Sequence, residues 1–197
     1  SEGSGLLAGA PVPDIRVRII RNQWGSPIGP FAESEFDAEC QPPGHAGEIV
    51  VSGEHVLSGY LRGQGDQETK FRVSDGVWHR TGDAGYLDPQ GRLWLLGRCE
   101  SRIEDVRGVL YPFSVECIAN ECPGIRRTAV VSQGGRRLLA VELEPGTGQA
   151  QLDKLITAVA WAQIDCIKVI SRIPVDRRHN SKVDYPKLKQ ALNGPFC

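Results

Sequence analysis

Alternating apolar and polar side chains predict β-structure in the first half of the chain. The stretch "IRVRIIR" (15–21) alternates β-branched residues with arginines, the period of two that a half-buried strand shows. Two apolar runs bounded by glycine, 47–53 and 92–98, predict further strands, and "DPQG" (88–91) has the composition of a tight turn. The stretch 23–45, which contains Pro and Gly, is predicted to be a long loop. This half therefore indicates a small twisted β-barrel or sheet.

Helical periodicity begins after about Gly97. Pro112 opens the stretch "PFSVECIANEC" (112–122) and Pro123-Gly124 ends it, so a helix is predicted here. Its apolar face consists of Val115, Ile118, Ala119 and Cys122. The next stretch, "TAVVSQGGRRLLAVELEP" (128–145), has two apolar runs on either side of two glycines and predicts a β-hairpin.

The last part of the chain adds a helix, a strand and a helix. The first helix is predicted at 149–161, and the strand at 166–170. The apolar face of that helix consists of Leu152, Leu155, Ile156 and Val159. Asp184 has the position of an N-cap for a short helix through Leu192. The order β-α-β-β-α-β-α predicts a compact two-layer domain, so the fold class is α+β, with a β-rich part at 1–96 and a second domain at 97–197.

Composition limits the class of protein. With 197 residues, 40% of them apolar, the chain is long enough to bury a sizeable core, and we expect a folded, soluble protein. No apolar run is long enough for a membrane span, and the N-terminus lacks the pattern of a secretory signal, so a cytoplasmic location is expected. The chain contains no methionine, and we interpret it as part of a longer protein.

Net charge and cysteine spacing add little to the predicted class of protein. The net charge of −1 argues against a general nucleic-acid-binding protein. The segment 172–189 is basic, which suits either a solvated face or a ligand that bears phosphate. The six cysteines are scattered without the spacing of metal ligands, and we predict that they are reduced thiols.

Motifs for nucleotide chemistry do not stand out from spacing alone. The chain has no Walker-type phosphate loop, no G-x-G-x-x-G and no Ser-His-Asp spacing. Four quoted stretches are nevertheless informative: "GEIVVSGEHVLSGYL" (47–61), "ETKF" (68–71), "WHRTGDAGYLDPQGRLWLLGR" (78–98) and "IPVDRRHNSKVDYPKL" (173–188). In this order, over nearly the whole chain, they resemble successive motifs of the adenylate-forming enzymes, the superfamily of acyl-CoA synthetases, peptide-synthetase adenylation domains and luciferases.

The resemblance implies a reaction in two half-steps. A carboxylate attacks the α-phosphorus of ATP to give an acyl-adenylate and pyrophosphate, and the acyl group then passes to a nucleophile. An anion attacks an anion here, so a positioned cation lowers the barrier. By similarity Lys182 is that cation, and an ordinary surface lysine is the alternative. ATP with Mg²⁺ is implied as cofactor, bound mostly by a part of the enzyme that lies upstream.

Three further residues match positions of the family. Asp83, in "TGD", matches the aspartate that accepts hydrogen bonds from the two ribose hydroxyls, and its alternative is a turn cap. Arg98, in "LLGR", matches an arginine that reaches the ribose and phosphate, and its alternative is a surface ion pair. Glu100 lies where the family places the hinge of its C-terminal domain, and an ordinary loop acid is the alternative. Supporting rather than reacting roles are expected for Tyr60, His79, Arg80 and Gly82, and no metal ligand is predicted.

Two departures from the family pattern indicate which branch of the superfamily the chain resembles. Asn180-Ser181 precede Lys182 where most members have a Gly-Lys pair, and the spacing from Gly97 to Gly108 is one residue longer than usual. Both features resemble the olefin-biosynthesis branch, whose members adenylate a β-hydroxy acid and close it to a β-lactone. Coenzyme A is then not needed, although an ordinary acyl-CoA ligase that uses it stays open. Nothing in the sequence identifies the acid.

By the same resemblance the chain covers the last third of an enzyme. Residues 1–96 are expected to be the end of the large AMP-binding domain and 97–197 the small lid domain, with the rest of the large domain as partner. We expect the isolated chain to be inactive, because Asp83 and Lys182 would face an incomplete pocket. A stand-alone binding module, whose basic C-terminal segment docks an acidic partner, is the alternative from a different functional class.

Overall fold

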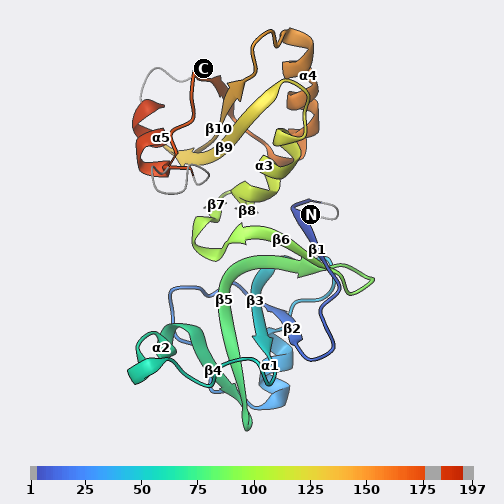
Figure 1. Cartoon of the computed structure of the whole chain (residues 1–197), viewed down its shortest axis with the longest axis vertical. Coiled ribbons are helices and arrows are strands. Elements are labelled where there is room, and N and C mark those ends of the chain that lie inside the picture. The colour runs from blue at the N-terminus through green and yellow to red at the C-terminus, as the bar shows by residue number, and fades with distance from the viewer. Residues whose placement is uncertain (1–3, 176–182, 193–197) are drawn as a thin grey trace. The chain divides into compact units, whose positions relative to one another are not determined.

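The chain forms two compact units, Ser1–Ser101 and Arg102–Cys197 (Figure 1). The computed structural model describes residues 4–175 and 183–192, and Lys182 lies outside them. The division between the units follows a few residues after the predicted boundary at 96/97.

A curled six-stranded sheet makes up most of the first unit (Figure 1). Its strands run in the order β1-β6-β5-β3-β2, and β4 also pairs with β5. Every pairing in this sheet is antiparallel. The elements are β1 (Leu6–Gly9), β2 (Arg16–Ile20), α1 (Glu33–Glu39), β3 (Gly47–Ser52), α2 (Asp66–Thr69), β4 (Lys70–Val73), β5 (Gly76–Leu87) and β6 (Leu93–Arg98), with short 3-10 segments at Leu61–Gly63 and Cys99–Ser101. The strands predicted at 15–21, 47–53 and 92–98 are therefore confirmed.

Helix α1 interrupts the stretch that was predicted to be a loop, so that prediction is wrong for 33–39. The helix is two turns long and buries a single large side chain, Phe36, which is why apolar periodicity does not reveal it. Glu35 accepts a hydrogen bond of 2.8 Å from the Ala32 backbone N–H and so caps the first turn. Phe36 packs against the rings of Phe71 and Trp78, with ring centres 5.7 and 4.7 Å away.

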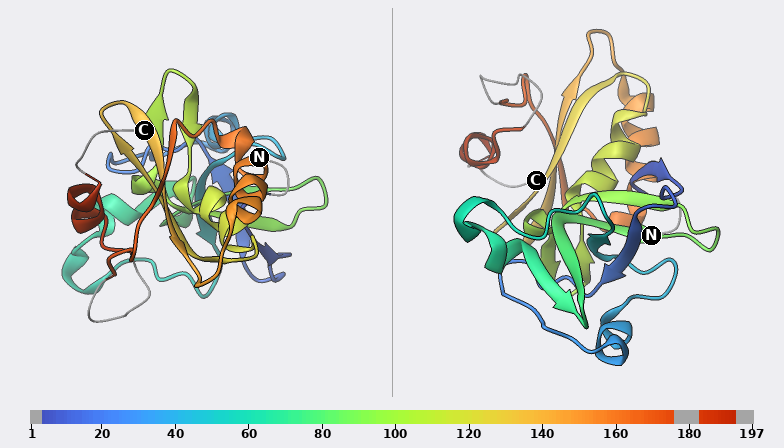
Figure 2. Two further views of the ribbon diagram at one scale, coloured as in Figure 1. Left: turned by 90° about the horizontal axis from the view of Figure 1, so that it is seen from above. Right: turned by 60° about the horizontal axis from the view of Figure 1, so that its bottom comes forward.

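From α3 onward the second unit has the predicted order of elements, but two strands rather than one precede that helix. A hairpin of β7 (Ile103–Asp105) and β8 (Gly108–Leu110) precedes a three-stranded sheet of order β11-β10-β9, in which β10 is antiparallel to β9 and parallel to β11. The remaining elements are α3 (Pro112–Asn120), β9 (Ile125–Gln133), β10 (Arg136–Leu143), α4 (Gln149–Ala158), a 3-10 segment (Ala160–Ala162), β11 (Cys166–Val169) and α5 (Tyr185–Ala191). Further views of the ribbon are given in Figure 2.

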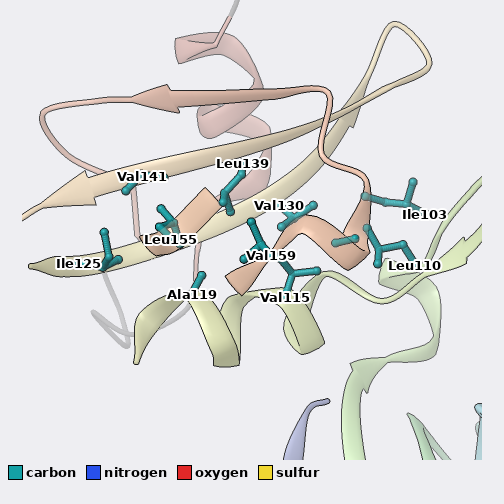
Figure 3. Packing of buried hydrophobic residues seen from close by; sticks show 11 residues of the cluster. Ile103, Leu110, Val115, Ala119, Ile125, Val130, Leu139, Val141, Leu155 and Val159 are labelled. Carbon is teal, nitrogen blue, oxygen red and sulfur yellow. The ribbon is translucent and has the colours of Figure 1, made fainter. Parts of the chain in front are cut away.

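Side chains of β9 and β10 alternate between two hydrophobic clusters. One face of the sheet packs against α3 and α4, and Figure 3 shows Val115 and Ala119 of α3 pointing toward Val130 and Leu139 of the sheet. The other face packs against α5 through Leu188. This two-sided burial follows from the period of two along each strand. Of the residues predicted on the buried face of α4, Ile156 does not fit, because it is 49% exposed.

Four charged side chains fasten the β7–β8 hairpin to the rest of the second unit. Asp105 accepts hydrogen bonds of 2.8 Å from both Nε and Nη2 of Arg137, and one of 2.9 Å from Arg107 Nη2. Arg107 also makes two bonds of 2.9 Å to Asp165. Hydrogen bonds from Arg137, and then from Arg107, hold the pKa of Asp105 well below its usual range.

This arrangement predicts a pH dependence of stability. Since the pKa of Asp105 is lower in the folded chain, its stabilising effect is present above the ordinary carboxyl pKa of about 4 and is lost as the pH falls below it. We expect Asp105→Asn to lower the free energy of unfolding at neutral pH, and the difference from wild type to shrink as the pH falls from about 6 to about 2. Urea unfolding of both proteins across this range measures the difference. A constant difference would contradict the assignment.

The cysteines differ from the prediction at one position. Cys40, Cys99, Cys117 and Cys122 form no disulfide and are reduced, as expected. Cys166, at the start of β11, is disulfide-bonded, so the prediction of a reduced thiol is wrong there. Sequence spacing does not reveal which thiols approach one another, because pairing depends on the Cα and Cβ positions in the folded chain.

Within residues 4–175 and 183–192, no helix has both the length and the apolar character that a membrane crossing requires.

Candidate functional site

A β-bulge in the middle of β5 presents Asp83. The register between β3 and β5 shifts between Glu48 and Val50, so that residues 81–83 of β5 lie opposite the single residue Ile49 of β3. Asp83 then pairs in register with Arg98 of β6, and Asp83 Oδ1 lies 3.3 Å from Arg98 Nη1. The two side chains are 39% and 62% exposed. Bulges commonly re-aim a side chain next to functional sites, and this one brings a carboxylate and a guanidinium together at the surface.

The residues before Asp83 fix the shape of the bulge. Thr81 Oγ1 donates a 2.9 Å hydrogen bond to the Ile49 carbonyl and accepts one of 3.1 Å from the Asp83 backbone N–H. Gly82 has φ +73°, a conformation that side chains other than glycine rarely adopt. A Cβ at Gly82 would lie 3.0 Å from the Trp24 ring, so the backbone there approaches the indole closely. The "TGD" sequence thus has a local structural reason at each of its three positions.

A buried ion pair is formed by two residues that flank this bulge, one on each strand. Arg80 and Glu48 are 1% and 0% exposed, and two hydrogen bonds of 2.6 and 2.7 Å join the guanidinium to both carboxylate oxygens. Arg80 Nη1 also donates to the Ser26 carbonyl at 2.6 Å, and its guanidinium lies 5.3 Å from the centre of the Trp24 ring. A bidentate pair of this kind has a defined geometry. Arg80 therefore holds β3, β5 and the segment around Trp24 together.

Tyr60 and His79 form a separate cluster near the start of β5. Their ring centres are 6.4 Å apart, and the Lys70 ammonium lies 5.2 Å from the Tyr60 ring centre. His79 Nδ1 lies 3.1 Å from the Thr69 carbonyl oxygen. Burial, and next the positive charge of Lys70, lower the pKa of His79. A half-buried and neutral imidazole at pH 7 suits packing between strands.

Glu100 lies at the end of the first unit. It is exposed, whereas Cys99 before it is fully buried. Ser101 Oγ donates a 2.8 Å hydrogen bond to the Arg98 carbonyl, which closes the 3-10 segment, and the division between the units follows Ser101. The hinge role of Glu100 stays a prediction.

The described residues on either side of 176–182 are held together. Val175 and Val183 form an isolated antiparallel bridge, and the Asp184 N–H donates to the Pro174 carbonyl at 2.9 Å. The predicted N-cap is confirmed, since Asp184 accepts a 3.1 Å hydrogen bond from the Lys187 backbone N–H. Lys182 itself is outside the described residues, so its catalytic role stays a prediction.

Sequence reasoning named Asp83 and Arg98 as site residues and expected supporting roles for Arg80 and Gly82. It missed Glu48, Trp24 and Asn22, which contact these supports or the backbone beside the pair. Glu48 could have predicted a buried ion pair, because an acid within the apolar run 47–53 needs a cation beside it when it is buried. Trp24 and Asn22, by contrast, lie in a stretch without periodicity. Among the described residues there is no group of three or more His, Cys, Asp or Glu that could hold a metal ion. The site can offer a carboxylate and a guanidinium to a polar ligand, and no metal ligand is assigned to it.

Relatives of known function match nearly all of the chain. No family model matches it. The olefin β-lactone synthetase of Stenotrophomonas maltophilia is 36% identical over 202 residues, which cover 94% of this chain and 36% of that protein. The 2-succinylbenzoate–CoA ligase of Enterococcus faecalis is 35% identical over 126 residues, 64% of this chain and 22% of that protein. The chain thus spans about a third of the length of the β-lactone synthetase.

Solved structures have the same fold. The amide bond synthetase McbA from Marinactinospora thermotolerans superimposes with a TM-score of 0.67 at 25% identity, over 94% of this chain and 36% of that one. The O-succinylbenzoate coenzyme A synthetase of Bacillus subtilis, solved with AMP, has a TM-score of 0.65 at 23% identity, over 96% of this chain and 35% of that one. At this identity the match is evidence for a shared fold only. The predicted α+β fold class is confirmed by this match to the C-terminal part of adenylate-forming enzymes. The chain therefore belongs to the adenylate-forming superfamily, together with acyl-CoA and aryl-CoA ligases and β-lactone synthetases.

Proposed function

We propose that this chain is the C-terminal part of an ATP-dependent ligase that activates a carboxylic acid as its acyl-adenylate. Residues 1–96 would complete the large AMP-binding domain, 97–197 would form the lid, and the working enzyme would be cytoplasmic. A carboxylate oxygen attacks the α-phosphorus of ATP, the bond from that phosphorus to the bridging oxygen breaks, and pyrophosphate leaves. Asp83 and Arg98 would bind the nucleotide, and Lys182 would offset the negative charge where carboxylate and phosphate meet.

The paired arrangement of Asp83 and Arg98 is the observation that carries this proposal. An ionised carboxylate can accept hydrogen bonds from two neighbouring hydroxyls, as the ribose of ATP presents them. A guanidinium beside it can bind a phosphate oxygen through its fork of N–H groups. Both side chains are partly exposed, and the backbone that carries Asp83 is held by Thr81, so the site is open to a ligand and fixed in shape.

We further propose that the acid is a β-hydroxy acid and that its own hydroxyl attacks the adenylate to close a β-lactone. The supporting observation is that two olefin β-lactone synthetases each match 94% of this chain. The 2-succinylbenzoate–CoA ligase of Enterococcus faecalis matches 64% of it. An intramolecular attack needs no second substrate, and proximity can contribute ~7 kcal/mol or more to such a step. AMP is the leaving group. Transfer to coenzyme A is the competing second step, favoured by the relatives that are named CoA ligases.

The experiment is ATP–pyrophosphate exchange by the longer protein that contains this chain, assayed with β-hydroxy and unsubstituted fatty acids. We expect exchange with the β-hydroxy acid and release of a β-lactone without coenzyme A. Asp83→Ala should raise KM for ATP roughly 100-fold, because two hydrogen bonds to a charged acceptor are lost. The 197-residue chain alone serves as the inactive control. Exchange that is unaffected by Asp83→Ala would contradict the nucleotide site, and a product that requires coenzyme A would contradict lactone formation.

A further inference from the structure

The segment Asn22–Ser26, which follows β2, contacts both sides of the Asp83–Arg98 pair. On one side, the Trp24 indole lies close to Gly82, the residue before Asp83, with three ring carbons 3.0 to 3.4 Å from the position that a Cβ would take. On the other side, Asn22 Nδ2 donates a 3.3 Å hydrogen bond to the carbonyl of Cys99, the residue after Arg98. One short segment therefore supports the backbone next to each member of the pair.

The two contacts are connected to each other and to the interior of the sheet. Asn22 Oδ1 accepts a 3.1 Å hydrogen bond from the Trp24 backbone N–H, so the side chain of Asn22 links the indole-bearing residue to Cys99. The far end of the segment is anchored by the 2.6 Å bond from Arg80 to the Ser26 carbonyl. Arg80 is itself fixed by Glu48, and its guanidinium faces the Trp24 ring. The segment is thus held at three places, two of them in strand β5 and one in the 3-10 segment that follows β6.

The Asp83–Arg98 pair needs such external support. At 39% and 62% exposure, an ion pair of this kind contributes little to holding its own geometry, because water screens it and long side chains lose rotamer freedom. A ligand site must nevertheless be held close to its binding geometry to be effective. The backbone on both sides of the pair is where that geometry can be imposed.

We propose that Trp24 and Asn22 are positioning residues, which hold Asp83 and Arg98 in the arrangement that binds the ribose and phosphate of a nucleotide. This inference rests on the proposed function. Both residues would act on the backbone beside the pair and not on the ligand directly. Trp24 prevents the bulge at Gly82 from collapsing inward, and Asn22 fixes the carbonyl that follows Arg98.

The test uses the longer protein with Trp24→Leu and Asn22→Asp. The second change keeps the shape of the side chain and places an oxygen where the N–H₂ donor was, opposite the Cys99 carbonyl. We expect KM for ATP to rise roughly tenfold in each variant, the effect of weakening one hydrogen bond to a charged group, with KM for the acid unchanged. We also expect the preference for ATP over 2′,3′-dideoxy-ATP to fall by a similar factor, which a general loss of stability would not produce. Trp24→Phe, which retains a flat ring, should restore most of this preference.

Trp94→Leu is the matched control. Trp94 is a partly buried tryptophan of the same sheet, stacked on Tyr86 with ring centres 6.0 Å apart and bonded to Asp88. It should lower the thermal midpoint without changing the preference for ATP over the dideoxy nucleotide. Asp83→Ala distinguishes a failure of the positioning role from a failure of the nucleotide site itself. If Asp83→Ala removes the preference but the Trp24 and Asn22 variants keep it, the positioning role is wrong and the nucleotide site stands. If wild type shows no such preference, the nucleotide site itself is wrong.

Discussion

Replacing Lys182 with alanine in the longer protein is expected to lower the rate of ATP–pyrophosphate exchange by about 100-fold or more, with ATP binding nearly unchanged. The carboxylate and the α-phosphate are both negative, and their approach gathers negative charge in the transition state. A single positioned donor at such a point is worth ~3 kcal/mol, and its effect falls mainly on the rate because the charge is most concentrated there. We therefore expect Lys182→Ala to lower kcat more than the affinity for ATP.

Lys189→Ala is the control for this prediction. Lys189 lies in the last turn of α5, is exposed, and carries the same charge in the same basic part of the chain. If Lys182 acted only through the overall positive charge of 172–189, both variants would lose activity equally. We expect Lys189→Ala to keep near-normal exchange. Near-normal exchange by Lys182→Ala would refute the catalytic role and would leave the basic segment as a solvated or docking surface.

Glu48→Ala is expected to destabilise the first unit by about 3–5 kcal/mol, the largest effect on stability that we predict. Arg80 is 1% exposed and keeps its charge when Glu48 is removed, so an unpaired guanidinium would remain in the interior of the sheet. The alanine also leaves a cavity next to β5. The same change should loosen the bulge, since Arg80 would lose the two bonds that orient it toward Trp24 and Ser26.

The measurement is chemical unfolding of the 197-residue chain, monitored by circular dichroism. Glu54→Ala, which truncates an exposed acid of the same unit, should change stability by no more than about 0.5 kcal/mol. The double variant Glu48→Leu/Arg80→Met should recover much of the loss, because it removes both charges and refills the volume with apolar atoms. A loss below about 1 kcal/mol in Glu48→Ala would show that water reaches Arg80, contrary to the buried pair.

The sequence alone was sufficient for most of the secondary structure of the chain, because local patterns carry that information. A period-two run predicted β2, and apolar runs bounded by glycine predicted β3 and β6. The helix start at Pro112 and the N-cap at Asp184 were predicted correctly from single residues. The hairpin at Gly134-Gly135 followed from two glycines that adopt positive φ. Helix α1 was missed because a two-turn helix with one buried side chain has too few positions to show a period.

The candidate site also contains residues that the sequence predicted and contacts that only the structure shows. Asp83 and Arg98 were named from short motifs, but they face each other through the pairing of β5 with β6. No pattern in "HRTGDAG" predicts the bulge in β5 that includes Asp83. Asn22 and Cys99 are 77 positions apart in the chain, and Glu48 and Arg80 are 32 apart. Such pairs form only when the strands of the sheet pair, since side chains distant in sequence meet through strand order and register rather than through local preference. The sequence by itself therefore determined most of the elements, the family resemblance and the candidate site residues of this protein. Only the tertiary structure decided which buried groups lie around Asp83 and Arg98, because those contacts depend on strand order and register.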